Sequence, residues 1–187
     1  MRTHTALATL LALAAQPALA QSWGPACPAG GAVQRSNGVT MAYLGASAAN
    51  PDICRLRRGA DEPADYYFGI WATAWPGADD AYAALKQVLP GPAGTMVRFD
   101  VRAGPGLQWH ETLRNDGRET LNVLGRLWDT MKVSHEREGF EGNTYHSIIT
   151  VWRDVATGMA VYQNYQHISG HPEPGGAWDP VAVTTAR

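Results

Sequence analysis

Hydrophobic and polar residues alternate along much of the chain, which is the pattern of strands that bury one face. In the clearest run Val97, Phe99 and Val101 alternate with charged residues. An Asn37-Gly38 pair between two short apolar runs predicts an early hairpin. The other alternating segments are 107–123, 130–137, 144–154 and 159–169. The chain is therefore predicted to be mainly β and antiparallel, because short loops join consecutive segments.

The remaining segments complete the predicted architecture. Ala81, Leu85 and Val88 follow the helical period as far as Pro90, which predicts one short helix near 79–89. The aromatic stretch at 64–75 is typical of a strand buried on both faces, and 181–185 is expected to add an edge strand. We expect about eight to ten strands in a meander that forms a barrel or a barrel-like sandwich.

The segment LQWHETLRNDGRETLNV, residues 107–123, predicts two strands joined by a turn. A two-residue loop would mix polar and apolar side chains on both faces. A three-residue loop at 115–117 instead sets Trp109 opposite Val123 and Glu111 opposite Leu121, and leaves the other face uniformly polar. A slip of one residue would turn every side chain over, so the cleaner pattern is preferred. It predicts that Glu111 faces the interior.

The first twenty residues have the pattern of a secretory signal peptide. A basic start precedes an apolar run of about ten residues, and Ala18-Leu19-Ala20 forms an A-x-A cleavage site. This run is too short to span a bilayer. We expect a periplasmic or secreted protein with no membrane insertion after cleavage. Residues 21–63 are predicted to form an N-terminal disulfide lobe packed on a β-domain at 64–187.

The cysteines bear on the cellular compartment, and the net charge bears on the class of partner. Cys27 and Cys54 are the two cysteines of the chain, and in an exported protein they predict one disulfide. The net charge is −2, with no basic block, which argues against nucleic acid as a partner. The sequence gives no oligomeric state.

Three histidines give the first candidate site. If 155–158 is a four-residue loop, His146 lies opposite His167, and if 138–143 is a loop, His135 lies opposite His146. The three imidazoles would then share one end of one sheet face, as ligands of a transition metal such as zinc, with Glu111 as general base or fourth ligand. Alternatively, the histidines line a pocket or bond singly at the rim, and Glu111 pairs with an arginine or a tryptophan N–H inside the fold.

The leading functional hypothesis is the binding of a small, partly apolar molecule, without catalysis. Its internal cavity would be bounded by Trp109, Val123, Ile148 and Tyr165. The expected ligand-binding residues are Glu111, Trp109, Gln163 and Tyr165, with the histidines as further polar lining. A metal-dependent isomerase, cyclase or hydrolase with His135, His146 and His167 as ligands is the alternative. A pocketless interaction module is the second alternative.

One short motif resembles a known family. Gly69-x-Trp71, near the start of the antiparallel run, is similar to the first-strand motif of lipocalins. Alanine follows the tryptophan where that family usually has an aromatic, leucine or basic residue, and the likeness covers a few residues of one strand. The resemblance implies a closed or nearly closed barrel.

Overall fold

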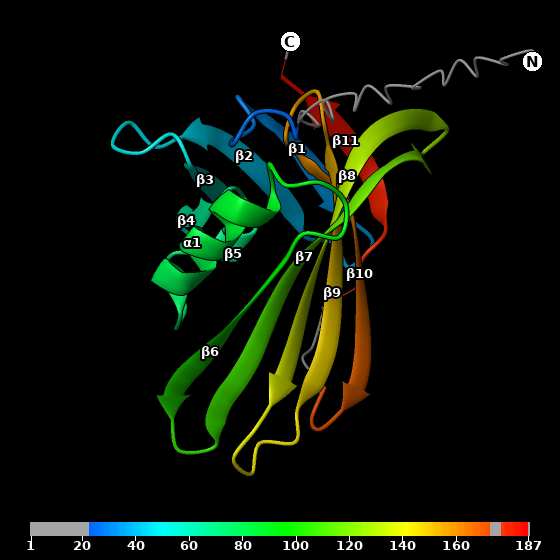
Figure 1. The fold of residues 1–187 in the computed structure, drawn as a ribbon. Helices are drawn as coiled ribbons and strands as arrows, with labels where there is room; N and C mark the ends of the chain where they lie inside the picture. Colours follow the sequence, from blue (N-terminus) through cyan, green and yellow to red (C-terminus); the bar gives the residue numbers. More distant parts are fainter. Residues whose placement is uncertain (1–22, 173–176, 187) are drawn as a thin grey trace, which may run out of the picture.

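The computed structural model describes residues 23–172 and 177–186, so the predicted signal segment 1–20 lies outside the described residues. The described part contains eleven strands and one helix (Figure 1). Their bounds are β1 Gly31–Arg35, β2 Thr40–Ala46, β3 Ile53–Arg58, β4 Ala64–Tyr67, β5 Trp71–Ala72, α1 Ala78–Val88, β6 Met96–Gly104, β7 Leu107–Val123, β8 Arg126–Gly139, β9 His146–Asp154, β10 Ala160–Ser169 and β11 Pro180–Thr185.

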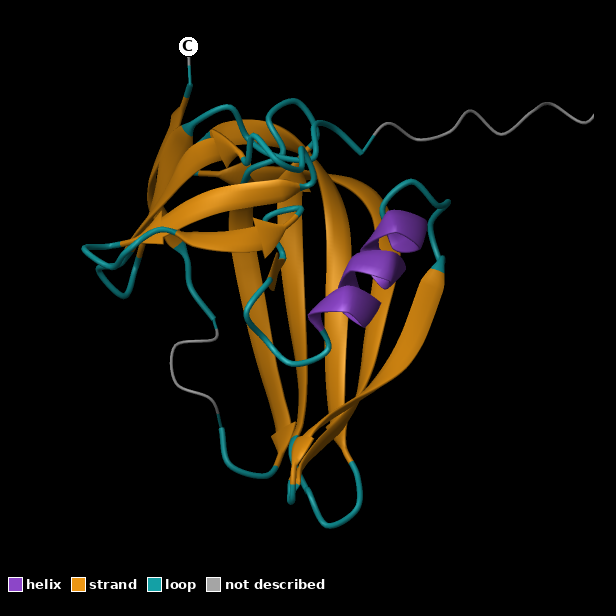
Figure 2. Cartoon of the chain, turned by 90° about the vertical axis from the view of Figure 1, so that its left-hand side faces the viewer, coloured by secondary structure: helices purple, strands orange, loops and turns teal. Residues whose placement is uncertain are grey.

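The strands form two antiparallel sheets. The first has the order β11-β1-β2-β3-β4-β5, and the second is the meander β10-β9-β8-β7-β6. Figure 2 shows the first sheet across one end of the long strands of the second, with α1 over one face of the second sheet. The predicted mainly β, sandwich-like fold is confirmed. The sheets do not close into a barrel, contrary to what the lipocalin resemblance implied.

Two apolar clusters hold these layers together. The first joins β1, β2 and β3 to the neighbouring ends of β7–β10, and Val33, Leu56 and Trp128 are among its buried members. The second packs α1 against the five-stranded sheet through Leu85 and Leu113, among others. We call the sheet face that carries Leu113 and contacts α1 the inner face.

The helix is fixed at both ends. At its start Gly77 has a φ of 74°, and a Cβ there would lie 2.5 Å from Val101 Cγ2, so glycine lets the chain close over the sheet. At its end the Asn115 side chain donates to the carbonyl oxygens of Val88 and Gly91, at 3.2 and 2.8 Å. These bonds fasten the last residue of the helix and the turn that follows it to β7. The predicted helix near 79–89 is confirmed.

The segment 107–123 is a single strand, so the predicted hairpin is wrong. Asn115 lies opposite Val133 and Gly117 opposite Lys132, which leaves Asp116 as the extra residue of a β-bulge. The Asn115 side chain also accepts from Gly117 N at 2.8 Å and stabilises this bulge. The chain turns instead at Leu124-Gly125, where both residues have positive φ, as a two-residue hairpin turn requires.

The predicted buried strand at 64–75 is also corrected. It is a short hairpin, in which β4 and β5 pair through Tyr66↔Ala72 and Tyr67↔Trp71. Phe68 and Gly69 form its turn with φ of 53° and 70°. The Gly69-x-Trp71 motif therefore lies in a turn and a two-residue strand, and not in a long first strand.

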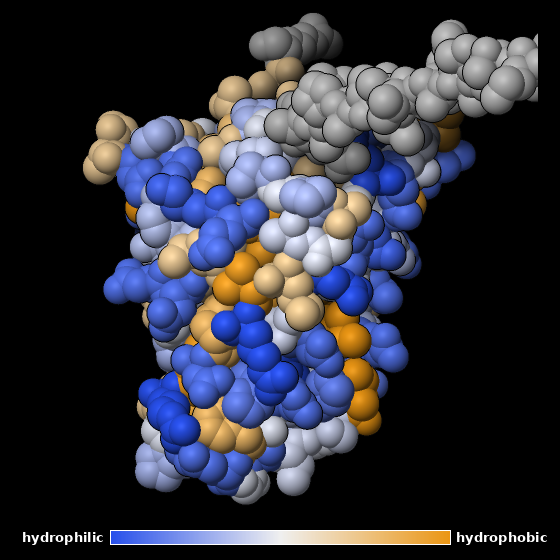
Figure 3. All heavy atoms as spheres, in the orientation of Figure 1, coloured by the Kyte–Doolittle hydropathy of each residue, from blue (hydrophilic) through white to orange (hydrophobic). Residues whose placement is uncertain are grey.

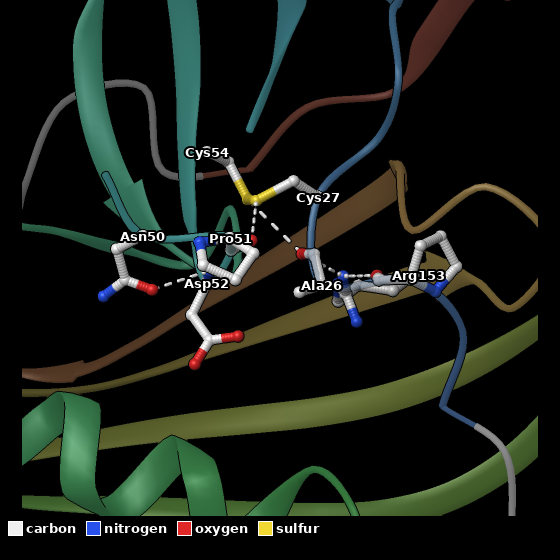
Figure 4. Close-up of a disulfide and its surroundings, with 8 residues drawn as sticks. Ala26, Cys27, Asn50, Pro51, Asp52, Cys54 and Arg153 are labelled. Atoms are coloured by element: carbon white, nitrogen blue, oxygen red, sulfur yellow. Dashed lines mark hydrogen bonds between the residues drawn. A yellow bond between two sulfur atoms is a disulfide. The ribbon is translucent and has the colours of Figure 1, made fainter. Parts of the chain in front are cut away.

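The Cys27–Cys54 disulfide is present, as predicted. Beside it Arg153 donates to the carbonyl oxygens of Pro25 and Ala26, both at 3.1 Å (Figure 4). Burial lowers the pKa of the Arg153 guanidinium to about 10, which leaves it charged at neutral pH. The 21–63 segment contributes β1–β3 to the six-stranded sheet, where β1 also pairs with the C-terminal β11.

One face of the molecule is mainly polar. Figure 3 shows hydrophilic residues over most of the visible face, with hydrophobic residues between them. Within residues 23–172 and 177–186, no helix is long and apolar enough to cross a membrane.

Candidate functional site

A buried carboxylate lies on the inner face of the five-stranded sheet. Glu111 of β7 is 0% exposed and lies directly opposite Arg137 of β8, while the next inner pair is Leu113 opposite His135. Directly opposed residues of neighbouring strands project to the same side. The prediction that Glu111 faces the interior is confirmed.

Both oxygens of Glu111 have cationic or imidazole partners. Arg137 Nε donates to Glu111 Oε1 at 2.8 Å, and His135 Nε2 lies 2.6 Å from Glu111 Oε2. The side chains of Arg137 and His135 are only 9% and 13% exposed. A buried charge is costly unless it is paired and hydrogen-bonded, and both oxygens of Glu111 meet that requirement here. The predicted arginine partner of Glu111 is therefore Arg137.

Two tryptophans enclose the Arg137 guanidinium. Its central carbon lies 5.0 Å from the ring centre of Trp75 and 5.0 Å from that of Trp109. Such distances allow cation–π attraction, which strengthens where water is excluded. Trp109 comes from β7, whereas Trp75 comes from the segment between β5 and α1.

A hollow of about 250 Å³ opens beside this stack. We call it the tryptophan hollow, and it is lined by Trp75, Pro76, Val101, Trp109, Glu111 and Arg137. Its walls are aromatic and aliphatic, with the Glu111–Arg137 pair as the charged groups. Trp75 is 49% exposed, so it lies at the boundary between the hollow and solvent.

A second hollow of about 150 Å³ adjoins the first, because Trp75 lines both. We call it the histidine hollow, and it is lined by Tyr66, Ile70, Trp71, Ala72, Trp75, His135 and Ile149. On the other side, Trp109 also lines a hollow of about 250 Å³ near the strand-end loops, together with Asn143 and His171 among others. Trp75 and Trp109 thus each line two of these three neighbouring hollows.

The predicted cluster of three histidines is not formed. Strand β8 pairs with β9 through His135↔Ile149 and Glu138↔His146, three residues away from the predicted register. An odd shift places His146 on the outer face, where its Nε2 lies 2.8 Å from Glu136 Oε1. Among the described residues, no group of three His, Cys, Asp or Glu side chains is arranged to hold a metal ion.

The third histidine lies on the inner face but at its rim. His167 is exposed and opposite Ser147, with its ring centre 6.3 Å from that of Tyr145 and 6.5 Å from that of Tyr165. His167 and His135 both lie on the inner face, but β9 separates their strands. His167 lies opposite Ser147 of β9, whereas His135 lies opposite Ile149. The structure thus brings His135 to Glu111 and leaves His167 apart.

The predicted ligand-binding residues divide into two groups. Trp109 and Glu111 line the tryptophan hollow together. Gln163 and Tyr165 project from β10 on the inner face, opposite Val151 and Ile149. The Tyr165 hydroxyl lies 3.3 Å from that of Tyr145, and Gln163 bridges to Trp178.

The single cavity predicted between Trp109, Val123, Ile148 and Tyr165 is wrong. Val123 lines a separate hollow with Tyr162, and Ile148 lines one on the outer face with Glu136. Strand β10 contains a bulge between Ala160 and Tyr162, which shifts the predicted β9–β10 pairs by one residue. That shift changes which side chains face the cavity.

Sequence reasoning missed Arg137, Trp75 and Trp71 as site residues. Arg137 follows His135 by two positions, so strand alternation could have placed both on the same face. The two tryptophans carried no such signal, because their segment folds back as a hairpin and turn. No family model, curated protein or solved structure matches this chain, so its function is inferred from the site itself.

Proposed function

We propose that the protein binds a small, uncharged, partly apolar molecule in the tryptophan hollow. The observation that carries this proposal is the buried Glu111–Arg137 pair on the floor of a hollow whose walls are Trp75, Trp109 and Val101. Ligand sites in proteins combine mostly apolar walls with a few placed polar groups, which is the composition found here.

Size and charge define the class of ligand. At about 250 Å³ the tryptophan hollow is smaller than the pockets of about 300–1,000 Å³ that hold drug-sized ligands, so its ligand should be smaller than a drug-sized molecule. Glu111 and Arg137 neutralise one another, so this pair offers no excess charge to an ion. An uncharged molecule with an aromatic or alicyclic part and one polar group fits these properties.

Export to the periplasm or the medium is part of the same proposal. The signal-peptide pattern of residues 1–20 supports it, and a disulfide is typical of an oxidising compartment. A binding protein in that compartment would meet small molecules before they cross the inner membrane.

Fluorescence of the neutral probe N-phenyl-1-naphthylamine tests the binding proposal. The purified protein is expected to enhance the probe emission saturably. Trp75→Ala should weaken binding about tenfold, because it removes one wall of the hollow. The matched control is Leu127→Ala, which truncates another large exposed side chain, 69% exposed, on β8.

The outcomes are distinct. Weaker binding in Trp75→Ala together with unchanged binding in Leu127→Ala supports the proposal. No saturable enhancement by the unmodified protein, or equal affinities in all three proteins, overturns it and favours a module without a functional pocket. Circular dichroism of each variant verifies that the fold is retained.

A further inference from the structure

The contact between His135 and Glu111 fixes how the imidazole carries its proton. Glu111 is a carboxylate held by Arg137, and a carboxylate accepts hydrogen bonds only. The 2.6 Å contact therefore has His135 Nε2–H donating to Glu111 Oε2. In the neutral ring the lone pair then belongs to Nδ1. No described residue hydrogen-bonds this Nδ1.

The surroundings of His135 resemble those of a proton-transfer site. His135 lines the histidine hollow beside Ile149 and Trp71, and the Trp71 ring centre lies 4.8 Å from that of His135. A buried carboxylate behind the imidazole orients it and stabilises the imidazolium that forms when it accepts a proton. Arg137 shares the charge of this carboxylate through Oε1, so Glu111 acts here mainly by orienting the ring through Oε2.

Trp71 forms an aromatic wall of the same hollow. It is only 3% exposed, and its ring packs against the imidazole of His135. Its indole N–H is buried without a hydrogen-bond partner in the described part of the chain, as are those of Trp128 and Trp178, so it is not available to a bound molecule. The hollow thus presents the imidazole between apolar walls.

We propose that His135, positioned by Glu111, is a general base that isomerises an uncharged, partly apolar, β,γ-unsaturated carbonyl compound. Its Nδ1 takes a proton from the carbon next to the carbonyl, and the C–H electron pair moves into the carbonyl to give an enolate. The same imidazolium returns the proton to another carbon of the conjugated enolate. Atoms and electrons balance without a co-reactant. This inference depends on the proposed binding function.

The uncharged probe 5-nitrobenzisoxazole tests the base. Removal of its C3 proton by Nδ1 makes the C–H electron pair part of a nitrile, breaks the N–O bond and releases a coloured nitrophenolate. General bases contribute about 10²–10⁴-fold to such steps. We expect His135→Ala to lower kcat at least a hundredfold with little change in KM, and added imidazole to restore part of the rate.

Three variants separate catalysis from structure. His135→Gln can still donate to Glu111 but cannot accept a proton in this way, so it should fold and bind N-phenyl-1-naphthylamine without turnover. Glu111→Gln should lower kcat by less than His135→Ala, as expected for a positioning residue. His167→Ala, on the same face but exposed, should match the unmodified protein.

The results that overturn this inference differ from those that overturn binding. If the unmodified protein is no faster than free imidazole at equal concentration, or if His135→Gln retains full turnover, His135 is not a general base, even where N-phenyl-1-naphthylamine binds normally. Loss of both probe binding and turnover in the unmodified protein rejects the binding function as well.

Discussion

Two ion pairs with similar nitrogen–oxygen distances should differ strongly in how much they stabilise this protein. Arg137 and Glu111 meet at 2.8 Å with side chains 9% and 0% exposed. Arg102 and Glu141 meet at 2.9 Å with side chains 56% and 54% exposed. Replacing each glutamate by glutamine removes one charge with little change in volume. Burial is therefore the main variable in the comparison.

The magnitudes follow from desolvation. Removing one partner of a buried pair costs about 3–5 kcal/mol, because the other charge stays buried without compensation. An exposed pair contributes about 0–1 kcal/mol, because water and salt screen it. We expect Glu111→Gln to lower the free energy of unfolding by about 3 kcal/mol and Glu141→Gln by less than about 1 kcal/mol.

A double-mutant cycle separates the ion pair from the other contacts of Arg137. Arg137→Met also removes the stacking on Trp75 and Trp109, so its single cost includes more than the charge pair. The Glu111→Gln/Arg137→Met double variant should be more stable than the sum of the two single losses predicts, by about 2–3 kcal/mol. The equivalent cycle at Arg102 and Glu141 should give a coupling near zero.

Urea unfolding followed by tryptophan fluorescence measures these free energies, with the disulfide intact in every variant. Equal losses for Glu111→Gln and Glu141→Gln would refute the reasoning, since burial would then have no effect. A coupling energy below about 0.5 kcal/mol at Glu111 and Arg137 would likewise show that the two charges do not depend on each other.

Three further predictions concern the framework around the site. Burial raises the pKa of the Tyr43 hydroxyl, so the stability that this group contributes is present below about pH 10 and is lost as the pH rises. The free energy of unfolding of Tyr43→Phe should therefore fall less steeply above pH 10 than that of the unmodified protein. Replacing Cys27 and Cys54 by alanine should cost about 3 kcal/mol in chemical denaturation, because it frees a long loop in the unfolded chain. Gly158→Ala should lower the melting temperature more than Gly38→Ala. Both glycines have positive φ, but a Cβ at 158 would lie 2.6 Å from a carbonyl oxygen, whereas a Cβ at 38 would meet nothing within 4 Å.

Alternation within a strand could be predicted from the sequence, because it depends on neighbouring residues only. It correctly placed Glu111 inside, since Trp109, Glu111 and Leu113 share one face whether 107–123 is a hairpin or one strand. The same argument predicted the paired runs around Asn37-Gly38 and the strand that became β6.

The hairpin error has a local physical cause. Asn-Asp-Gly fits a hairpin loop and also fits a β-bulge, because both use glycine at positive φ. Here a distant contact decides between them, since Asn115 donates to the end of α1. The true turn at Leu124-Gly125 was missed because leucine rarely adopts positive φ.

Pairing between strands could not be predicted from alternation. Val133 was expected opposite Ile148 and lies opposite Val151, and either pairing buries two aliphatic side chains. The sequence thus contains no strong preference between two registers that differ by an odd number of residues. Since the metal hypothesis required His135 and His146 on one face, that three-residue difference removed it.

We predict that the Glu111–Arg137–His135 network is not needed to build this sheet. Replacing a buried ion pair by apolar side chains of similar volume is often neutral or stabilising, so Glu111→Leu/Arg137→Met should fold at least as well as either single variant. The same double variant should lose both the orientation of His135 and turnover of 5-nitrobenzisoxazole. If stability and proton transfer separate in this way, the charged network serves the chemistry of the hollow. If the double variant cannot fold, the network is part of the framework and its position beside the hollow carries no functional meaning.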